Sequence, residues 1–279
     1  MESALKRSAR AAPHRLPGDA VHVLKFGSSV LAGPQDYPVV AEMIGRKVAR
    51  GRAVVAVVSA MGDTTDSLLA AARSVARILP DRLMGALLAT GEEASVALLT
   101  LALAGRGVRA AGFNSWRLPI RTQGSLSDAD PVAVDAAQIR ATLASHDAVV
   151  FPGFVGVDAT GVPSLLGRGG SDLTALFLGD ALGAAQVRLI KDVDGIFPVD
   201  PRLGRSPGPH PCDGPDAGPA DARTPCSQLT WAQARTIGGG VVQSKAIDFA
   251  EDRKLDFQVT GLTGKGTRVG RPGRWEATR

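Results

Sequence analysis

The regular part of the chain opens with Val21-His22-Val23-Leu24-Lys25-Phe26, which leads directly into Gly27-Ser28-Ser29. A short apolar run that stops at a glycine is typical of a buried strand ending in a turn. A second run, residues 53–58, is rich in β-branched residues and apolar throughout. An unbroken apolar run predicts a strand that is buried on both faces, as in a parallel sheet.

Helical and strand patterns alternate along the rest of the chain. Helices are predicted at residues 37–50, 66–77, 82–104 and 171–184, with Ser171 as the N-cap of the last. Further strands are predicted at residues 148–151 and 187–190. This alternation predicts an α/β fold, a three-layer αβα sandwich around a mostly parallel open sheet. Ligands of such sheets bind at the carboxyl ends of strands, where Gly27, Gly62, Gly153 and Gly195 fall.

Composition excludes several classes of protein. The chain has 279 residues, 44% hydrophobic and 21% charged, which excludes wholesale disorder. Aromatic residues make up 4%, too few for a platform that stacks single-stranded nucleic acid. The net charge of +5 comes from the ends, since residues 1–20 carry +2 and residues 268–279 carry +3. We therefore expect no nucleic-acid partner.

Only two cysteines suit a reducing cytosol, so the chain is expected to be cytoplasmic. No membrane partner is expected, because the longest aliphatic stretch, residues 94–104, is too short to span a bilayer. Two cysteines are too few for a disulfide scaffold, and a site built from His210, Cys212 and Cys226 matches no common metal pattern. The predicted organisation is a flexible leader (1–20), one domain (21–269) with a mobile Pro/Gly-rich loop at 203–227, and a flexible tail (270–279).

The strongest chemical signal is the run Leu166-Gly167-Arg168-Gly169-Gly170-Ser171-Asp172, which precedes a predicted helix. Its glycines let the backbone approach a ligand closely, and the start of the helix presents free N–H groups to an anion. The guanidinium of Arg168 suits a carboxylate. On its own, the run is equally compatible with an ordinary glycine-rich loop and a capped helix.

Two further signals lie at or just after the ends of predicted strands. Lys25 lies inside an apolar strand, which is costly unless its ammonium reaches a phosphate or water. The run Lys191-Asp192-Val193-Asp194-Gly195 follows the strand at 187–190, although a simple Asp-Gly turn would look similar. Neither a P-loop nor a Gly-x-Gly-x-x-Gly fingerprint is present, which disfavours P-loop ATPases and Rossmann dehydrogenases.

Together these motifs resemble the amino-acid kinase superfamily and, within it, the catalytic domain of the aspartate kinases. The resemblance extends over residues 21–269. It rests on motifs in matching order: Lys25-Phe26-Gly27, Val57-Val58-Ser59-Ala60-Met61-Gly62, Gly91-Glu92, Phe151-Pro152-Gly153-Phe154, Gly167 to Asp172, Asp192-Val193-Asp194-Gly195-Ile196 and Asp200-Pro201-Arg202.

The resemblance implies phosphorylation of the side-chain carboxylate of L-aspartate by ATP and Mg²⁺. A carboxylate is already an ionised nucleophile, so such a site needs positioning and charge neutralisation rather than a general base. It implies an amino-acid-binding lobe at about 21–165, a nucleotide-binding lobe at about 166–269, and a homo-oligomer such as a dimer. Mg²⁺ would be held by phosphates and water rather than by a dedicated residue.

The site residues are carried over by position. The implied catalytic residues are Lys25, Asp172 and Asp192, with Lys25 neutralising the transferred phosphoryl group. The implied substrate-binding residues are Ser59, Thr65, Glu92, Arg168 and Ser171, with Arg168 on the α-carboxylate and Glu92 on the ammonium. The implied ATP-binding residues are Gly27, Ser28, Gly169, Gly170, Lys191, Asp192, Phe197, Arg202 and Lys245.

The chain departs from the aspartate kinase pattern at several points. Val241 stands where the family has a phosphate-binding lysine, and Lys191 and Lys245 are both candidates to replace it. The Gly27-Ser28-Ser29 loop is one residue shorter than usual and resembles that of glutamate 5-kinases. Alternative functions are therefore a kinase of another amino acid or small acid, a non-catalytic binding protein, or nucleotide or oxyanion binding.

The sequence ends about ten residues after Gly266-Thr267, where the kinase domain of the family closes. Aspartate kinases typically continue into regulatory ACT domains at this point. We therefore expect an enzyme that lysine and threonine do not inhibit, unless a partner subunit supplies control.

Overall fold

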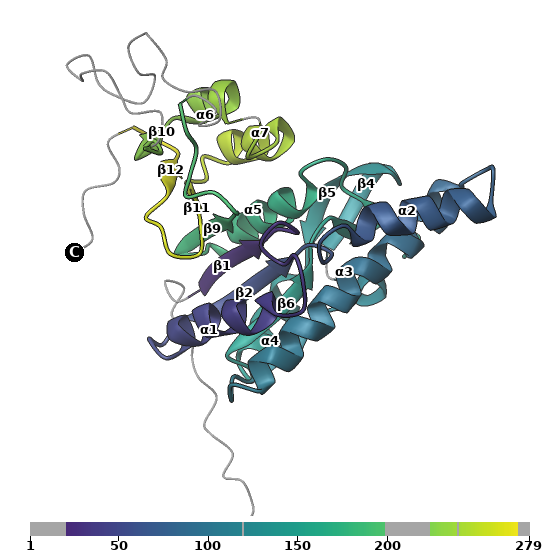
Figure 1. Ribbon diagram of the computed structural model, residues 1–279, viewed down its shortest axis with the longest axis horizontal. Helices are drawn as coiled ribbons and strands as arrows, with labels where there is room; N and C mark the ends of the chain where they lie inside the picture. Colours follow the sequence, from purple (N-terminus) through teal and green to yellow (C-terminus); the bar gives the residue numbers. More distant parts are fainter. Residues whose placement is uncertain (1–20, 119, 199–223, 239, 273–279) are drawn as a thin grey trace, which may run out of the picture.

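A computed structural model describes residues 21–118, 120–198, 224–238 and 240–272. Its main feature is an eight-stranded sheet (Figure 1). The strands, in spatial order, are β10 (Gln228–Leu229), β12 (Thr267–Val269), β11 (Phe257–Thr260), β9 (Gln186–Ile190), β1 (Val21–Phe26), β2 (Ala53–Val58), β6 (Ala148–Pro152) and β3 (Ala110–Gly112). From β11 to β3 all neighbours are parallel, and β12 is antiparallel to β11.

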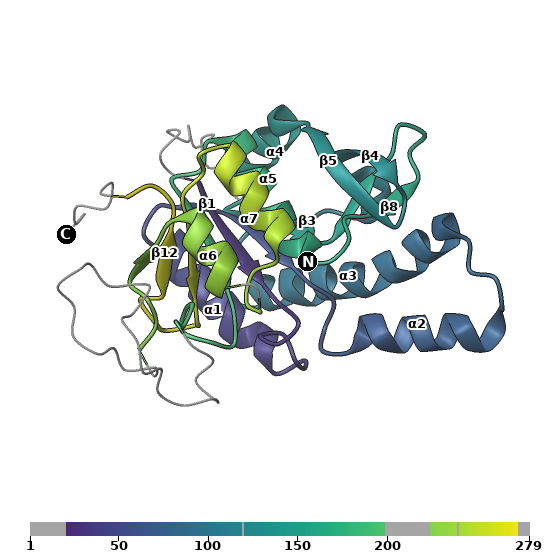
Figure 2. The ribbon, with the colours of Figure 1, turned by 90° about the horizontal axis from the view of Figure 1, so that it is seen from above.

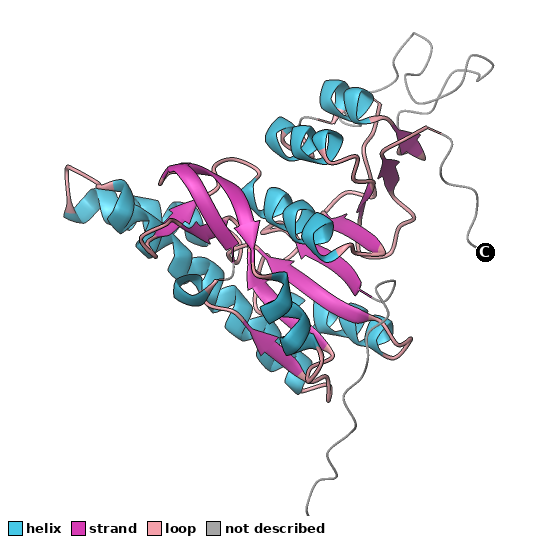
Figure 3. Cartoon of the chain, turned by 180° about the vertical axis from the view of Figure 1, so that it is seen from behind, coloured by secondary structure: helices cyan, strands magenta, loops and turns pink. Residues whose placement is uncertain are grey.

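Helices cover both faces of this sheet, which confirms the predicted three-layer α/β architecture (Figure 3). One face packs against α1 (Asp36–Val48) and α3 (Asp81–Ala104), and the other against α4 (Ala136–Leu143) and α5 (Gly170–Leu182). Side chains of β1 alternate accordingly, because Leu24 and Phe26 lie in the α1 core whereas Val21 and Val23 lie in the α5 core. Lys25 therefore points to the α5 side.

The remaining helices extend these layers. Helix α2 (Thr64–Val75) lies beside α3, and α6 (Trp231–Ile237) and α7 (Ser244–Asp252) lie near β10 and β12, with α7 packed against α5 (Figure 1). A short 3₁₀ turn, η2 (Ser115–Arg117), precedes the second sheet.

A second sheet was not predicted from the sequence. It has four strands, in the order β5 (Asp128–Val134), β4 (Ile120–Ser125), β7 (Val155–Val157) and β8 (Pro163–Leu165). It lies beside α3, on the side of the molecule away from β12 and α6 (Figure 2). Strands β4 and β5 form an antiparallel hairpin, as do β7 and β8. This small sheet carries the chain into the Gly167–Gly169 loop.

The predicted strands and helices agree with the structure to within a few residues, but one detail is wrong. Ser171 is not the N-cap of α5, because the helix begins at Gly170 and the N-cap is Gly169. Gly169 has a φ of 75° and no room for a side chain, since an added Cβ would lie 2.6 Å from Cβ of Gln243. The turn therefore requires glycine, and Ser171 moves into the first turn of the helix.

Helix α3 is long and apolar enough to cross a membrane by length and composition alone. Within the described chain, however, much of it is buried against the sheets, including Leu99 and Leu103, and it carries a buried carboxylate at Glu92. These features are typical of a core helix. The predicted leader, most of the loop at 203–227 and most of the tail lie outside the described residues.

The order of the strands places a ligand site between β1 and β9. From β1 the chain proceeds outward through β2 and β6 on one side, and β9 and β11 then extend the sheet on the other side. The crevice outside the carboxyl ends of β1 and β9 is therefore a topological switch point, the usual ligand site of an open α/β sheet.

Candidate active site

A cavity of about 310 Å³ lies at this switch point. It brings together residues that the sequence predicted from five separate segments. The predicted residues that line it are Lys25, Ser28, Ser59, Thr65, Glu92, Arg168, Gly169, Gly170, Ser171, Asp172 and Lys191. The other lining residues are Ala60, Phe154, Gly167, Val241 and Gln243.

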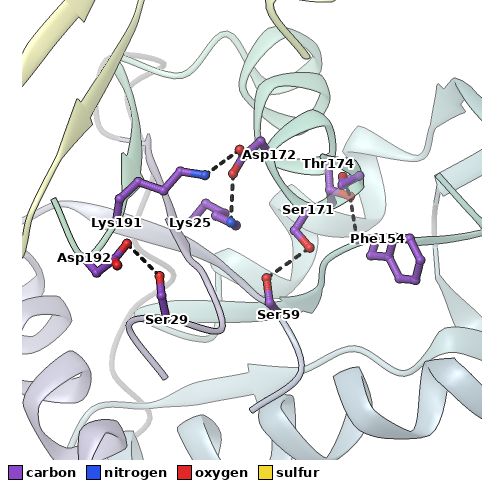
Figure 4. A network of polar contacts seen from close by, with 10 residues as sticks. Lys25, Ser29, Ser59, Phe154, Ser171, Asp172, Thr174, Lys191 and Asp192 are labelled. Atoms are coloured by element: carbon purple, nitrogen blue, oxygen red, sulfur yellow. Dashed lines mark hydrogen bonds and ion pairs between the residues drawn. The ribbon is translucent and has the colours of Figure 1, made fainter. Parts of the chain in front are cut away.

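Two lysines meet one aspartate in the wall of this cavity (Figure 4). Lys25 Nζ lies 2.8 Å from Asp172 Oδ1, and Lys191 Nζ donates to Asp172 Oδ2 at 2.6 Å. The register of β1 and β9 explains the meeting, since Phe26 pairs with Ile190 and both lysines therefore emerge near the same end of the sheet. Asp172 comes down onto them from the first turn of α5.

This cluster is electrostatically coupled and carries one positive charge in excess. Burial alone would raise the pKa of Asp172, but the ammonium groups of Lys25 and Lys191 outweigh it and hold that pKa below its usual value. Burial and the charge of Lys25 lower the pKa of Lys191 despite its ion pair with Asp172. A cavity wall with surplus positive charge favours an anionic ligand such as a phosphate.

Glu92 faces the same cavity from α3, and its side chain is only 3% exposed. Burial raises the pKa of its carboxyl group to about 8, although a backbone N–H of Ala60 and the charge of Lys25 act in the opposite direction. In the described part of the chain, Glu92 Oε2 has no hydrogen-bond partner. A buried acceptor of this kind is suited to a cationic donor on a ligand.

The first turn of α5 is held close to the ends of β2 and β6. Ser59 Oγ, just after β2, donates to Ser171 Oγ at 3.1 Å (Figure 4). Gly153, just after β6, lets this turn approach, because an added Cβ would lie 2.6 Å from Cβ of Ser171. The N–H groups at the start of α5 therefore lie at the cavity, where Arg168 stands exposed beside them.

Other predicted residues do not line the cavity. Gly27 lies next to it, and a Cβ added to Gly27 would lie 3.2 Å from Lys25 Nζ. Asp192 is exposed and accepts a hydrogen bond from Ser29 Oγ at 2.9 Å. Phe197 is half-buried. Arg202 lies outside the described residues.

Lys245, predicted to bind ATP, is held by other groups. Its ammonium lies 2.7 Å from Asp128 Oδ1 and 3.1 Å from Asp130 Oδ1, and it donates to the carbonyls of Ala129 and Leu166. These contacts join α7 to the start of β5 and to the residue before Gly167. Lys245 therefore braces the glycine-rich loop in this structure.

Gln243 and Phe154 line the cavity but were not predicted as site residues. Gln243 packs against Gly169, and the backbone N–H of Phe154 donates to Thr174 Oγ1 in α5 at 3.2 Å. Phe154 lies in a motif that carried the family resemblance, and Gln243 lies two residues after Val241, where that resemblance predicts a phosphate-binding lysine, so both positions were detectable from the sequence.

No metal-binding cluster is found in the ranges that the structure describes, where no three His, Cys, Asp or Glu residues gather as ligands. His210 and Cys212 fall outside these ranges, and Cys226 is buried. Among the described residues, the carboxylates that line the cavity are Glu92 and Asp172, and Asp172 already binds two ammonium groups. This donor set fits a Mg²⁺ ion that arrives with nucleotide phosphates and keeps water as ligands.

Comparison with known proteins gives consistent matches. Residues 20–207 match the amino acid kinase family. The chain is 33% identical over 237 residues to an aspartokinase of Geobacillus stearothermophilus, covering 85% of this chain and 55% of that protein. It is 34% identical over 252 residues to an aspartokinase of Pseudomonas aeruginosa, covering 90% and 58%. The chain thus spans little more than half the length of these curated relatives.

Solved structures are similar in fold. Aspartate kinase from Synechocystis superposes with a TM-score of 0.72 at 26% identity, over 92% of this chain and 41% of that one. Aspartokinase III of E. coli in complex with aspartate and ADP superposes with a TM-score of 0.75 at 22% identity, over 90% and 64%.

Proposed function

The chain belongs to the amino acid kinase family, and from this premise we propose that it transfers the γ-phosphoryl group of ATP to the side-chain carboxylate of L-aspartate. The observation that carries the proposal is the convergence of Lys25, Lys191 and Asp172 on a cavity that also contains Arg168 and Glu92. The two relatives described above, at 33% and 34% identity, are aspartokinases, and the E. coli aspartokinase III structure is a complex with aspartate and ADP.

The substrate would be recognised at both of its amino-acid groups. Arg168 would bind the α-carboxylate through a bidentate pair, and Glu92 would accept from the ammonium. When that ammonium arrives, its charge favours the ionised form of Glu92, which then releases a proton to water. Ser59, Thr65 and Ser171 also line the cavity and would position the side-chain carboxylate.

Phosphoryl transfer would rest on charge neutralisation. An oxygen of the aspartate side chain attacks the γ-phosphorus, the bond to the ADP oxygen breaks, and an acyl phosphate and ADP are formed. Lys25 and Lys191 would neutralise the transferring group, and Asp172 would hold both ammonium groups in place. Mg²⁺ would neutralise part of the β- and γ-phosphate charge when it is bound with the nucleotide.

Lys191 is the better candidate to replace the lysine that the family resemblance predicts at Val241. Both Lys191 and Val241 line the cavity. Lys245 does not line it, and its ammonium is already bound by two carboxylates and two carbonyls. We therefore assign the second phosphate-neutralising charge to Lys191.

The short loop after β1 keeps one alternative open. Ser28 of this loop lines the cavity, so the acceptor could be a different amino acid or small acid. Asp192 and Phe197 stay candidate nucleotide contacts, and the cytoplasmic location and the dimer stay predictions from the sequence.

The test is ATP consumption with each of the twenty amino acids, in the presence of hydroxylamine as a trap for acyl phosphate. We expect ADP and a hydroxamate with L-aspartate. Hydroxamate formation with another amino acid would establish that the acceptor is not aspartate. If no amino acid supports ATP consumption, the kinase proposal is refuted.

A charge-relocation experiment tests the role of Lys191. Lys191→Thr should lower kcat by about a hundredfold or more, because a preorganised charge is lost at the transferring group. The double variant Lys191→Thr/Val241→Lys should recover part of this loss. Full activity of the single variant would show that Lys191 has no part in the reaction.

A further inference from the structure

A second group of basic side chains lies at the opposite end of the same strands. His22 is the second residue of β1 and pairs in register with Gln186, the first residue of β9. Arg188 follows two residues later on the same face of β9, and Lys47 reaches this face from the last turn of α1. We call His22, Lys47 and Arg188 the basic cluster. It lies on the α1 face of the sheet near the amino end of β1, whereas the catalytic cavity lies outside the carboxyl ends of β1 and β9.

The cluster is connected by direct contacts. Lys47 Nζ lies 3.3 Å from His22 Nδ1 and donates to Gln186 Oε1 at 3.2 Å. An Nη of Arg188 donates to Thr260 Oγ1 at 3.3 Å, whereas its Nε is buried and has no hydrogen-bond partner in the described part of the chain. All three side chains are half-buried. Donors are thus gathered here in excess of acceptors.

The charges in this region repel one another. The pKa of Lys47 is lowered to about 8 by burial and then by Arg188, Arg50 and Arg52. The pKa of His22 is lowered to about 4 by burial and then by Lys47, Arg52 and Arg188, with only a hydrogen bond to Gln186 acting in the opposite direction. No carboxylate of the described residues contributes to either shift.

Three other basic residues of the described chain show the usual arrangement. Lys245, Arg109 and Arg235 each bind at least one carboxylate. Convergent, half-buried cations without a carboxylate between them cost stability unless an anion neutralises them. Such an arrangement is typical of a site for a small oxyanion, which also accepts several hydrogen bonds at once.

We propose that the basic cluster binds a phosphate group, with Lys47 and Arg188 donating to its oxygens and His22 adding a proton donor. The phosphate dianion would bring the acceptor that Arg188 Nε lacks in the described part of the chain, and the counter-charge that the Lys47 ammonium lacks there. The same chemistry could come from free phosphate or from a phosphate monoester, and the test separates these sources. The site is independent of the catalytic cavity and of the function proposed for it.

The most specific readout is the titration of His22. The chain has four histidines, and the resonance of His22 can be assigned in NMR spectra with a His22→Gln variant. In millimolar inorganic phosphate, compared with chloride at equal ionic strength, the pKa of His22 should rise by about one unit or more, because an anion stabilises the imidazolium. A parallel titration with glycerol 2-phosphate shows whether a monoester is accepted. An unchanged His22 titration with both probes would overturn the proposal.

Matched variants on α1 supply the second measurement. Lys47→Met should weaken phosphate binding, followed through the His22 resonance, by about tenfold or more, because one charge-assisted hydrogen bond is lost. Arg46→Met removes the same charge one residue earlier, where the side chain is 70% exposed and pairs with Glu42, and should leave the affinity unchanged. Equal affinities in the two variants would mean general charge screening and would refute a defined site. Neither measurement depends on kinase activity.

Discussion

Replacing Glu92 by glutamine tests the electrostatics of the cavity most directly. Glu92 is buried, and its pKa rises from an ordinary value of 4.5 to about 8. Between these two values the folded protein keeps the proton and the unfolded chain loses it. The free energy of unfolding contributed by this group is therefore greatest below pH 4.5 and is lost as the pH rises to about 8.

The size of the effect follows from that shift. Each pH unit in this range should lower the stability by about 1.4 kcal/mol, and the whole range by up to about 5 kcal/mol. Glutamine has the shape of the protonated carboxyl group and does not titrate. The stability of Glu92→Gln should therefore match that of the wild type at about pH 5 and exceed it by several kcal/mol at about pH 8.5.

The measurement is urea unfolding of both proteins across this pH range, without aspartate or ATP. The difference between the two curves isolates Glu92, because the other titrating groups are common to both. Aspartate affinity gives a second check, since it should rise by up to about tenfold per pH unit in the wild type below pH 8 and stay flat in the variant. Parallel pH curves for the two proteins would refute the raised pKa.

Three further changes test other parts of the site. Arg168→Ala should raise the KM for aspartate by about fiftyfold and leave the KM for ATP unchanged, because one charge-assisted pair with the substrate is lost. If steady-state kinetics show a raised KM for ATP and an unchanged KM for aspartate, Arg168 binds the nucleotide instead. In the same urea assay, Gly153→Ala should lower the free energy of unfolding by about 1–3 kcal/mol, because the added Cβ would lie 2.6 Å from Cβ of Ser171. Gly240→Ala is the control and should have little effect, because a Cβ added there would meet no atom within 4 Å. Lys245→Met should raise the KM for aspartate more than that for ATP, because Lys245 braces the loop that carries Arg168; a rise confined to ATP would restore it as a nucleotide ligand.

Much of the central sheet could be predicted because its strands are simple in sequence. Residues 21–26 and 53–58 are apolar runs that end at glycine or near it, and the structure has β1 and β2 at these bounds. The valine-rich run at 53–58 is typical of a strand that is buried on both faces. Lys25 lies near the carboxyl end of the first strand and Ser59 directly follows the second, so their place at this edge of the sheet could be predicted with the strands.

The second sheet could not be predicted in the same way. Strand β5 begins Asp128-Ala129-Asp130-Pro131, a polar run containing proline that resembles a loop, and β4 ends in Gln123-Gly124-Ser125. These strands are fixed by tertiary contacts such as the buried hydrogen bond between Thr122 and Ser164. Such contacts join residues far apart in the chain and leave no local pattern.

The position of Lys245 could not be predicted for a related reason. Its residue type suits a phosphate, and it lies close in sequence to the position of the family's lysine. Its partners Asp128 and Asp130 lie on a strand that the sequence did not reveal. A charged side chain cannot be assigned to a ligand until its protein partners are known.

The central place of β1 has a consequence for synthesis of the protein. This strand is bordered by β2 on one edge and by β9 on the other, and β9 begins at Gln186. A ribosome adding about 5–20 residues per second needs on the order of ten to thirty seconds to reach β9 after β1 has been made. Throughout that interval the nascent polypeptide presents an apolar strand with one edge unoccupied, which makes it a natural client for chaperones that shield such edges from aggregation.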